Sequence, residues 1–465
     1  MPPLEYQLLL DRARAAALAF FESLSDRPVR ADARYDDLLR SLPATLPEAP
    51  TDAATVLDDL VRQVDPGLVA SAGPRYFGFV TGGAFPVSVA ADWLVSAWDQ
   101  NTMLHVMSPA VSALEACTAG WILDALGLPP GASVGFVTGA HMANVTALAA
   151  ARHEMLRRVG WDVEALGVQG APTLTLIAAE EAHSSIGAAA RFIGVGSRTV
   201  RRVPSDSEGR MRSDALQSAL SEASRPAIVC AQAGNVNTGA CDPFHEIAAL
   251  AHAHGAWLHV DGAFGLWAAA SPSRRALVAG LPDADSWTTD AHKWLNVPYD
   301  SGIVIVRHAA AHRAAMSQTA EYLIPADGTE RDGGDWVPEA SRRARVVPIH
   351  AVLRTLGRSG LAELVDRCSR LAERMADRLR PLPGAEILND VVLNQVLVRF
   401  VAASGENRTR ALIAAVQQAG VCWCGGTAWR GEPAMRISIS NWRTNDEDVD
   451  RSAASIADMM RNLYN

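Results

Sequence analysis

Between about residues 75 and 310, short apolar runs alternate with stretches of helical periodicity, and this alternation constrains the fold more than any other feature. The apolar runs are nearly continuous, which is typical of strands that are buried on both faces of a sheet. Strands separated by helices favour a parallel or mixed sheet with helices packed on it. The sequence therefore predicts an α/β fold built on a large, doubly wound, mostly parallel sheet. The predicted strands are 133–137, 173–178, 226–230, 256–260 and 301–306, and the helical stretches between them are 142–156, 184–192, 243–254 and 273–279.

Two smaller regions flank this large domain, which we place at residues 75–323. Helical spacing near both ends of residues 1–74 predicts an N-terminal helical arm that is too short to form a domain of its own. Segment 324–340 is rich in Gly, Asp and Pro and predicts a mobile loop. Residues 341–465 predict a smaller C-terminal α+β domain. The expected helices are 4–24, 52–65, 341–380, 407–419 and 445–463, and the expected strands of the small domain are 385–389, 393–401, 421–424 and 434–440.

Charge and composition exclude several classes of partner. The net charge is −9 and no basic stripe offsets it, which argues against a nucleic-acid ligand. Apolar runs stay below the roughly 18 residues of a membrane span, and the N-terminus has no export signal. The six cysteines lie in mostly apolar contexts, which fits a reducing compartment. We therefore expect a soluble, cytoplasmic protein that binds neither nucleic acid nor membrane.

Lys293 is the only lysine, because all the other members of the 42 lysine and arginine residues are arginines. Arginine can replace lysine at most surface positions, but its guanidinium is never deprotonated in proteins and forms no imine with an aldehyde. A lysine amine reacts with carbonyls once burial or nearby cations favour its neutral form. The neighbours of Lys293 are His292 and Trp294 rather than a run of charges. This pattern favours covalent carbonyl chemistry over a chance surface position.

Four stretches have the chemistry of a pyridoxal phosphate site. A turn of small residues at Gly139 joins a strand to a helix, where backbone N–H groups and the helix dipole favour a phosphate. His183 follows an apolar strand and can stack on an aromatic ring. Asp261 ends a buried strand, where a carboxylate is costly unless it meets a positive charge such as a protonated pyridine nitrogen. Each feature alone has an ordinary alternative: a simple turn, a structural histidine or a capping residue. With Lys293 they form one ordered set.

The order of these stretches resembles the group II pyridoxal phosphate-dependent decarboxylases, relatives of aromatic-L-amino-acid and glutamate decarboxylases within the aspartate aminotransferase fold type (fold type I). The resemblance covers roughly residues 70–465. The residues that carry it are Ser108-Pro109 with Leu114-Glu115, Ala182-His183-Ser184-Ser185, Asn237-Thr238-Gly239, His259-Val260-Asp261 and His292-Lys293-Trp294.

The resemblance implies three catalytic residues. Lys293 would carry the cofactor as an imine, Asp261 would pair with the pyridine nitrogen, and His183 would stack on the ring. The further cofactor contacts that it implies are Gly139, Ala140, His141, Ala263 and His292. It also implies a homodimer with active sites at the interface and segment 324–340 beside the active site. No metal is expected, because neither the His252-x-His254 pair with His259 nor Cys422-x-Cys424 has the spacing of a metal site.

The implied reaction is decarboxylation of an L-amino acid to an amine and CO₂, a carboxy-lyase activity of amino-acid metabolism. Aromatic residues near the motifs favour a substrate with an aromatic or apolar side chain. Arg436, on a predicted C-terminal strand, is a candidate for the substrate carboxylate, although an ion pair at the surface or between domains explains it equally well. The candidates for the pocket lining are Phe79, Thr81, Trp98, His105, Trp336 and Trp429.

Two departures from the family pattern keep other functions open. Family members often have Asn-Pro before His-Lys, where this chain has Asp290-Ala291. A phosphate repels a carboxylate, so Asp290 is expected to point elsewhere and Thr288 or Thr289 to take the phosphate contact. Some relatives use a loop tyrosine as the proton donor, but segment 324–340 contains none and Tyr322 lies just outside it. The alternatives are aldehyde-forming oxidative deamination, transamination or aldolase-type chemistry, and a non-catalytic cofactor-binding protein.

Overall fold

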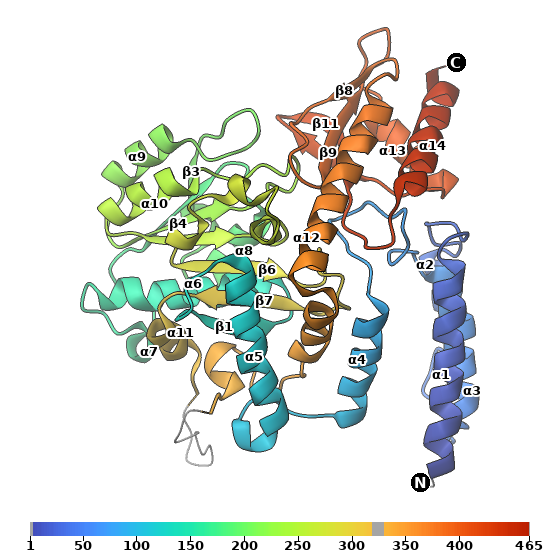
Figure 1. Cartoon of the computed structure of the whole chain (residues 1–465), viewed down its shortest axis with the longest axis horizontal. Helices are drawn as coiled ribbons and strands as arrows, with labels where there is room; N and C mark the ends of the chain where they lie inside the picture. The colour runs from blue at the N-terminus through green and yellow to red at the C-terminus, as the bar shows by residue number, and fades with distance from the viewer. Residues whose placement is uncertain (1–2, 319–329, 465) are drawn as a thin grey trace.

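The computed structural model describes residues 3–318 and 330–464 (Figure 1). Its large domain is built on a seven-stranded sheet in the order β1-β7-β6-β5-β4-β2-β3. β7 is antiparallel to both of its neighbours, and the other pairs are parallel. The predicted α/β, mostly parallel sheet is confirmed. The strands are β1 (Ser133–Val137), β2 (Thr175–Ala179), β3 (Arg201–Val203), β4 (Ala227–Gln232), β5 (Trp257–Asp261), β6 (Ser286–Asp290) and β7 (Gly302–Val306).

Helices cover both faces of this sheet, which explains the continuous apolar runs. Along β4, Ile228 and Cys230 pack into the core on one face, while Val229 and Ala231 pack into the core on the other. Successive side chains of a strand point to opposite faces, so a strand covered on both sides needs apolar residues at every position. One layer contains α6 (Ala140–Arg157), α8 (Ser184–Phe192) and α11 (Ala309–Met316), and the other contains α4 (Pro86–Trp98), α5 (Pro109–Leu126), α9 (Ser213–Glu222), α10 (Phe244–Ala253) and the first part of α12 (Val346–Leu379).

β6 was missed from the sequence because it is polar. Its Ser286 hydroxyl accepts the Trp257 indole N–H at 2.9 Å, and its Thr288 hydroxyl donates to Asn144 at 2.9 Å. Buried polar side chains are tolerated when they are hydrogen-bonded in this way. The predicted helix at 273–279 is also wrong, since that stretch forms only the short 3₁₀ turn η5 (Arg275–Val278).

The small domain packs a four-stranded antiparallel sheet, in the order β10-β11-β9-β8, against helices. α12 is interrupted by a non-helical residue, Gly357 (φ +59°); its buried residues up to Cys368 pack in the core of the large domain, and those from Leu371 on pack in the core of the small domain. The predicted strand at 421–424 is wrong: Cys422 and Cys424 are buried in irregular chain, and the strand starts at Gly425. The elements are β8 (Ala385–Ile387), β9 (Gln395–Phe400), α13 (Thr409–Ala419), β10 (Gly425–Trp429), β11 (Glu432–Ser438) and α14 (Asp446–Tyr464).

The N-terminal arm stands apart from the large domain (Figure 1). Its elements are α1 (Pro3–Ser23), α2 (Tyr35–Ser41), α3 (Ala53–Val64) and the 3₁₀ turn η1 (Asp65–Gly67). α1 and α3 lie side by side, yet none of the residues of α3 is buried. Several large apolar side chains of the arm are therefore exposed: Tyr6, Leu8, Leu10, Leu18, Leu39, Leu46, Val56, Leu60 and Val61.

A buried ion triad fixes the chain that follows the undescribed residues 319–329. Glu115 of α5 contacts Arg342 at 2.7 Å and Arg331 at 2.9 Å, and its side chain is 1% exposed. Arg342 also donates to the Thr102 carbonyl at 2.8 Å. These contacts hold both ends of residues 331–342 against α5 and β1. Part of the segment 324–340, predicted as a mobile loop, lies outside the described residues, and so does Tyr322. The predicted domain boundaries stay predictions.

No helix in the described ranges combines the length and the apolar composition that a bilayer crossing requires.

Candidate active site

The sheet brings the four predicted stretches to one edge. β2, β4, β5 and β6 run parallel, and β1 and β6 both lie antiparallel to β7 between them. The carboxyl ends of β1, β2, β5 and β6 therefore face the same edge, where open α/β sheets bind their ligands. Gly139, His183, Asp261 and Lys293 all follow or end one of these strands. The topology thus converts four distant stretches into one site.

Asp261 ends β5 and is 7% exposed, and three donors hold its carboxylate. Asn144 Nδ2 donates to Oδ2 at 3.1 Å, and Ser185 Oγ donates to the same oxygen at 3.3 Å. The backbone N–H of Ala263 donates to Oδ1 at 3.1 Å. Asp261 is thereby kept as an oriented acceptor at the strand end.

Asn144 connects Asp261 to the polar strand β6. Its Oδ1 accepts from Thr288 Oγ1 and from His259 Nε2, each at 2.9 Å. Burial lowers the pKa of His259 to about 4, so the imidazole is neutral and carries its proton on Nε2, toward Asn144. Asn144 was not predicted from the sequence, and Ser185 was part of a predicted motif without a role of its own. The signal that could have found them is their position near the start of a helix that follows a strand of this edge: Asn144 lies about one turn into α6, and Ser185 is the second residue of α8.

His183 caps the start of α8. Its Nδ1 accepts the Ser185 N–H at 3.2 Å and lies 2.8 Å from the Ser185 hydroxyl, which links it to Asp261. Since Nδ1 acts as the acceptor, the proton of the neutral ring sits on Nε2. Loss of hydration lowers the pKa of His183, against a raising effect of Asp261, and Lys293 lowers it further. The neutral ring, with a free Nε2–H, is therefore the favoured state near neutral pH.

Lys293 lies in the turn after β6 and makes an ion pair with Asp290. Its Nζ is 3.2 Å from Asp290 Oδ2, and its side chain is 19% exposed. The other oxygen, Oδ1, accepts the backbone N–H of Ala140 at 2.5 Å and lies 3.4 Å from His292 Nε2. The expectation that Asp290 points away from the helix start is wrong. Thr288 and Thr289 are engaged elsewhere, with Asn144 and with the Ala263 carbonyl.

The start of α6 offers a close-fitting cradle. A Cβ at Gly139 would lie 3.3 Å from His292 Cε1 and 3.4 Å from Asp290 Oδ1, and a Cβ at Gly302 would come within 2.4 Å of the Gly139 Cα. His292 Nδ1 is buried and has no hydrogen-bond partner among the described residues. His141 is exposed beside this turn, with its ring edge against Phe192. Helix start, unpaired imidazole and reactive amine together fit a phosphate-bearing aldehyde.

Residues 76–83 run across the lysine turn. A Cβ at Gly82 would come within 1.9 Å of the Lys293 carbonyl oxygen, so only glycine permits this approach. Tyr299 is 64% exposed, and its ring stacks on His292 with the ring centroids 4.2 Å apart. Phe79, three residues before Gly82, is 62% exposed and packs on Trp423. Exposed aromatic rings therefore belong both to this segment and to the chain just after the lysine turn.

The other predicted lining residues of the substrate pocket have their contacts away from the lysine turn. Trp336 packs against His312, and Trp429 is buried against Leu397 in the small domain. Trp98 is exposed at the end of α4, and His105 hydrogen-bonds Ser112. Of the six candidates, Phe79 and Thr81 lie beside the lysine turn.

Asn296 joins the lysine turn to its surroundings. Its side-chain oxygen accepts the N–H groups of Gly83 and Trp442, at 2.6 and 3.0 Å, and its Nδ2 donates to the Ser440 carbonyl at 2.9 Å. Its own N–H donates to the Lys293 carbonyl at 3.2 Å. One fully buried amide thus contacts residues 83, 440 and 442 as well as the lysine turn.

Arg436 of β11 is close enough to His183 that its charge contributes to lowering the pKa of that imidazole. Its guanidinium has no ion pair or hydrogen bond within residues 3–318 and 330–464. Burial lowers the pKa of Arg436 without a compensating carboxylate. The ion pair considered from the sequence is therefore absent from the described chain, and the arginine is available to an anion.

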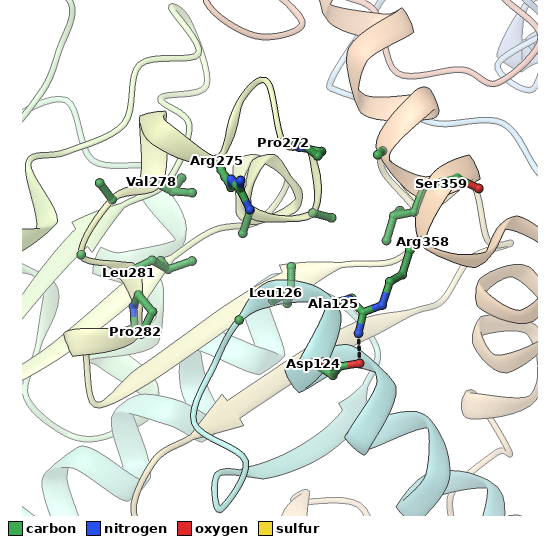
Figure 2. Close-up of a pocket in the computed structure, with 17 residues that line it drawn as sticks. Asp124, Ala125, Leu126, Pro272, Arg275, Val278, Leu281, Pro282, Arg358 and Ser359 are labelled. Atoms are coloured by element: carbon green, nitrogen blue, oxygen red, sulfur yellow. Dashed lines mark hydrogen bonds and ion pairs between the residues drawn. The ribbon is translucent and has the colours of Figure 1, made fainter.

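A separate cavity of about 630 Å³ opens between the end of α5, the 3₁₀ turns around Arg275 and α12 (Figure 2). Arg358 and Asp124 form an ion pair at its edge. Its walls include none of the residues at the strand ends around Lys293, so it is a different site.

Sequence comparison decides the family. The pyridoxal-dependent decarboxylase conserved domain matches residues 36–401. The chain belongs to this family. It is a pyridoxal phosphate-dependent amino-acid carboxy-lyase, as the residue pattern around Lys293 indicated.

Individual relatives of this decarboxylase align along most of its length. An aromatic-L-amino-acid decarboxylase of Bacillus atrophaeus is 27% identical and covers 92% of the chain and 89% of the relative. A phenylacetaldehyde synthase of Arabidopsis thaliana is also 27% identical, over 92% of the chain and 90% of the relative. Among solved structures, Oryza sativa TDC with PLP and tryptamine superposes with a TM-score of 0.94 at 23% identity, over 100% of this chain and 99% of that one, and confirms the fold.

Proposed function

We propose that this decarboxylase acts on an L-amino acid with an aromatic or apolar side chain. The observation that supports this most is the exposed Tyr299 ring stacked on His292, together with the exposed Phe79 on the segment whose Gly82 meets the Lys293 carbonyl. Aromatic rings at the rim bind apolar side chains through burial and ring stacking. The name of the Bacillus atrophaeus relative points to the same substrate class.

The geometry of the strand edge supports a set of proposed cofactor contacts. Lys293 supplies the amine, Asp261 the carboxylate for the pyridine nitrogen, and the start of α6 the donors for the phosphate. The contacts proposed for the phosphate end and the ring are Gly139, Ala140, His141, His183, Ala263 and His292. When bound, the cofactor provides an electron-accepting ring for the pair of electrons released as CO₂ leaves.

The protein residues orient the substrate and move one proton. Arg436, half-buried and without a partner in the described chain, pairs with the substrate carboxylate and fixes its direction. His183 in its doubly protonated form donates the Nε2 proton to Cα after CO₂ has left, becomes the neutral imidazole and takes up another proton from solvent. In the charged ring Nδ1–H donates to the Ser185 hydroxyl, which in turn donates to Asp261, so these two groups orient the imidazole. Lys293 then releases the amine product.

A panel of L-amino acids tests this assignment, with CO₂, amine, aldehyde and ammonia followed together. CO₂ with an equal amount of amine from aromatic substrates supports the proposal. Aldehyde with ammonia, or a keto acid, supports the second candidate, aldehyde-forming oxidative deamination or another reaction on the same scaffold. The lack of a tyrosine in segment 324–340 and the phenylacetaldehyde synthase relative favour that candidate. No turnover of any substrate would favour a non-catalytic cofactor-binding protein.

Replacing Arg436 by methionine is expected to lower kcat/KM about 100-fold, because the substrate carboxylate loses a partly buried charged partner worth roughly 2–3 kcal/mol. Steady-state kinetics would measure the change. Arg399→Met is the matched control, since Arg399 lies on the neighbouring strand β9 but pairs with Glu386 at the surface. Equal kinetics for the two variants would remove Arg436 from the substrate site.

We also propose a cytoplasmic homodimer in which the exposed arm covers a second copy. The supporting observation is the row of apolar side chains left uncovered on α1 and α3, because contiguous exposed apolar surface marks interaction sites. Sedimentation is expected to give about twice the 49.5 kDa of one chain. Leu60→Asp should shift the protein toward monomer, while Leu166→Asp, at an equally exposed leucine of the large domain, should not. A monomeric wild type would contradict the proposal.

A further inference from the structure

The carboxylate of Asp290 lies at the start of α6, which is the position proposed above for the cofactor phosphate. Its side chain is 4% exposed at the end of β6. One oxygen accepts the first backbone N–H of α6, from Ala140, and the other makes the ion pair with Lys293. His292, the imidazole with an unpaired buried nitrogen, is the third contact. The carboxylate therefore engages the amine and a phosphate donor at the same time.

This arrangement conflicts with the cofactor orientation proposed above, on which the inference rests. The phosphate needs the N–H groups at the start of α6, and one of them is already bonded to Asp290. Two anions in a poorly hydrated site repel each other more strongly than they would in water. The phosphate must therefore displace the carboxylate from Ala140 or bind beside its charge.

We propose that Asp290 is a built-in competitor of the cofactor phosphate. Without cofactor, its carboxylate occupies the start of α6 and pairs with Lys293, which keeps both groups in place. With cofactor, the same charge weakens the hold on the phosphate. Asp290 thus sets how readily this decarboxylase releases and rebinds its cofactor.

The contact and the charge of Asp290 can be separated. An asparagine at this position keeps an oxygen that can accept the Ala140 N–H, but it carries no charge to repel a phosphate. The neighbouring Thr288 and Thr289 hydroxyls are bonded elsewhere and do not replace Asp290 at the helix start. Asp290→Asn therefore changes mainly the electrostatics at the phosphate end.

The test compares two aldehydes on cofactor-free protein, pyridoxal phosphate and pyridoxal, by titration of the imine absorbance. Loss of the ion pair with Lys293 affects both aldehydes alike, so the ratio of their dissociation constants isolates the phosphate. In Asp290→Asn we expect this ratio to favour pyridoxal phosphate at least about 10-fold more than in the wild type. Asp285→Asn, at the opposite end of the same strand, should leave the ratio unchanged, because Asp285 pairs with His252 and His308. An unchanged or reversed ratio in Asp290→Asn would overturn the inference.

Asp290→Ser serves as a second uncharged variant if the asparagine protein does not fold, and the same shift is expected. Borohydride reduction separates this inference from the proposed function. An adduct on Lys293 with an unchanged ratio refutes only the role of Asp290. Absence of an adduct in wild-type protein refutes the cofactor attachment itself.

Discussion

Replacement of Lys293 by arginine is expected to lower turnover by at least about 1000-fold, on the scale seen when a nucleophile is removed from other enzymes. Arginine keeps the positive charge beside Asp290, but it cannot lose a proton to attack the cofactor aldehyde. The measurement is CO₂ release, combined with intact mass after borohydride reduction. Because the chain has no other lysine, a lysine adduct can form at this position alone.

The control for this variant is cofactor-free stability, which should stay close to the wild type because the ion pair with Asp290 is kept. Wild-type protein should gain the mass of one reduced cofactor, and Lys293→Arg should gain none. An arginine variant that is still yellow and still takes up the adduct would show that another amine carries the cofactor.

Glu115→Gln is expected to have the largest effect on stability, a loss of about 3–5 kcal/mol in the free energy of unfolding, because it leaves two buried guanidinium groups without their counterion. Arg342 is fully buried and Arg331 is 13% exposed, so water cannot replace the carboxylate. Urea unfolding followed by tryptophan fluorescence would measure the loss. The surface triad of Arg374, Asp450 and Arg378 offers a matched control, and Asp450→Asn should cost less than about 1 kcal/mol.

The buried triad of Glu115, Arg331 and Arg342 makes the stability of the protein depend on pH in a defined direction. Burial raises the pKa of Glu115, but Arg342 and Arg331 outweigh it and hold the pKa below the ordinary glutamate value. A depressed folded-state pKa contributes stability above the unfolded pKa, and this contribution is lost as the pH falls through the folded value. The difference between wild type and Glu115→Gln should therefore shrink as the solution is acidified through that window. A difference that stays constant would contradict an ionised Glu115.

The sequence predicted the architecture well where apolar periodicity is strong. The strands β1, β4 and β5 lie within one or two residues of their predicted bounds, because a strand covered on both faces needs apolar residues throughout. β6 escaped because its polar side chains are satisfied by hydrogen bonds that only the folded chain brings together. Likewise, Cys422 and Cys424 are buried in the core of the small domain without belonging to a strand, and Trp423 between them forms only an isolated bridge with Tyr76.

For the active site, residue chemistry predicted the principal groups, but not their partners. Lys293, Asp261 and His183 could be recognised from type and order. Asn144 could not, because its role depends on two strands and a helix meeting at one amide. Asp290 shows the limit most clearly: repulsion by a phosphate suggested that it points away, whereas attraction to Lys293 and to the Ala140 N–H holds it in place.

Asn296 has a consequence for the construction of hybrid enzymes. Its side chain bonds Gly83 before α4 and Ser440 after β11, and its backbone N–H bonds the Lys293 carbonyl. The contact between the C-terminal strands and the rest of the chain therefore lies three residues from the nucleophile. Exchange of the C-terminal half with that of a relative would have to preserve these backbone contacts. A crossover placed without regard to them would disturb Lys293 even though every cofactor residue were retained.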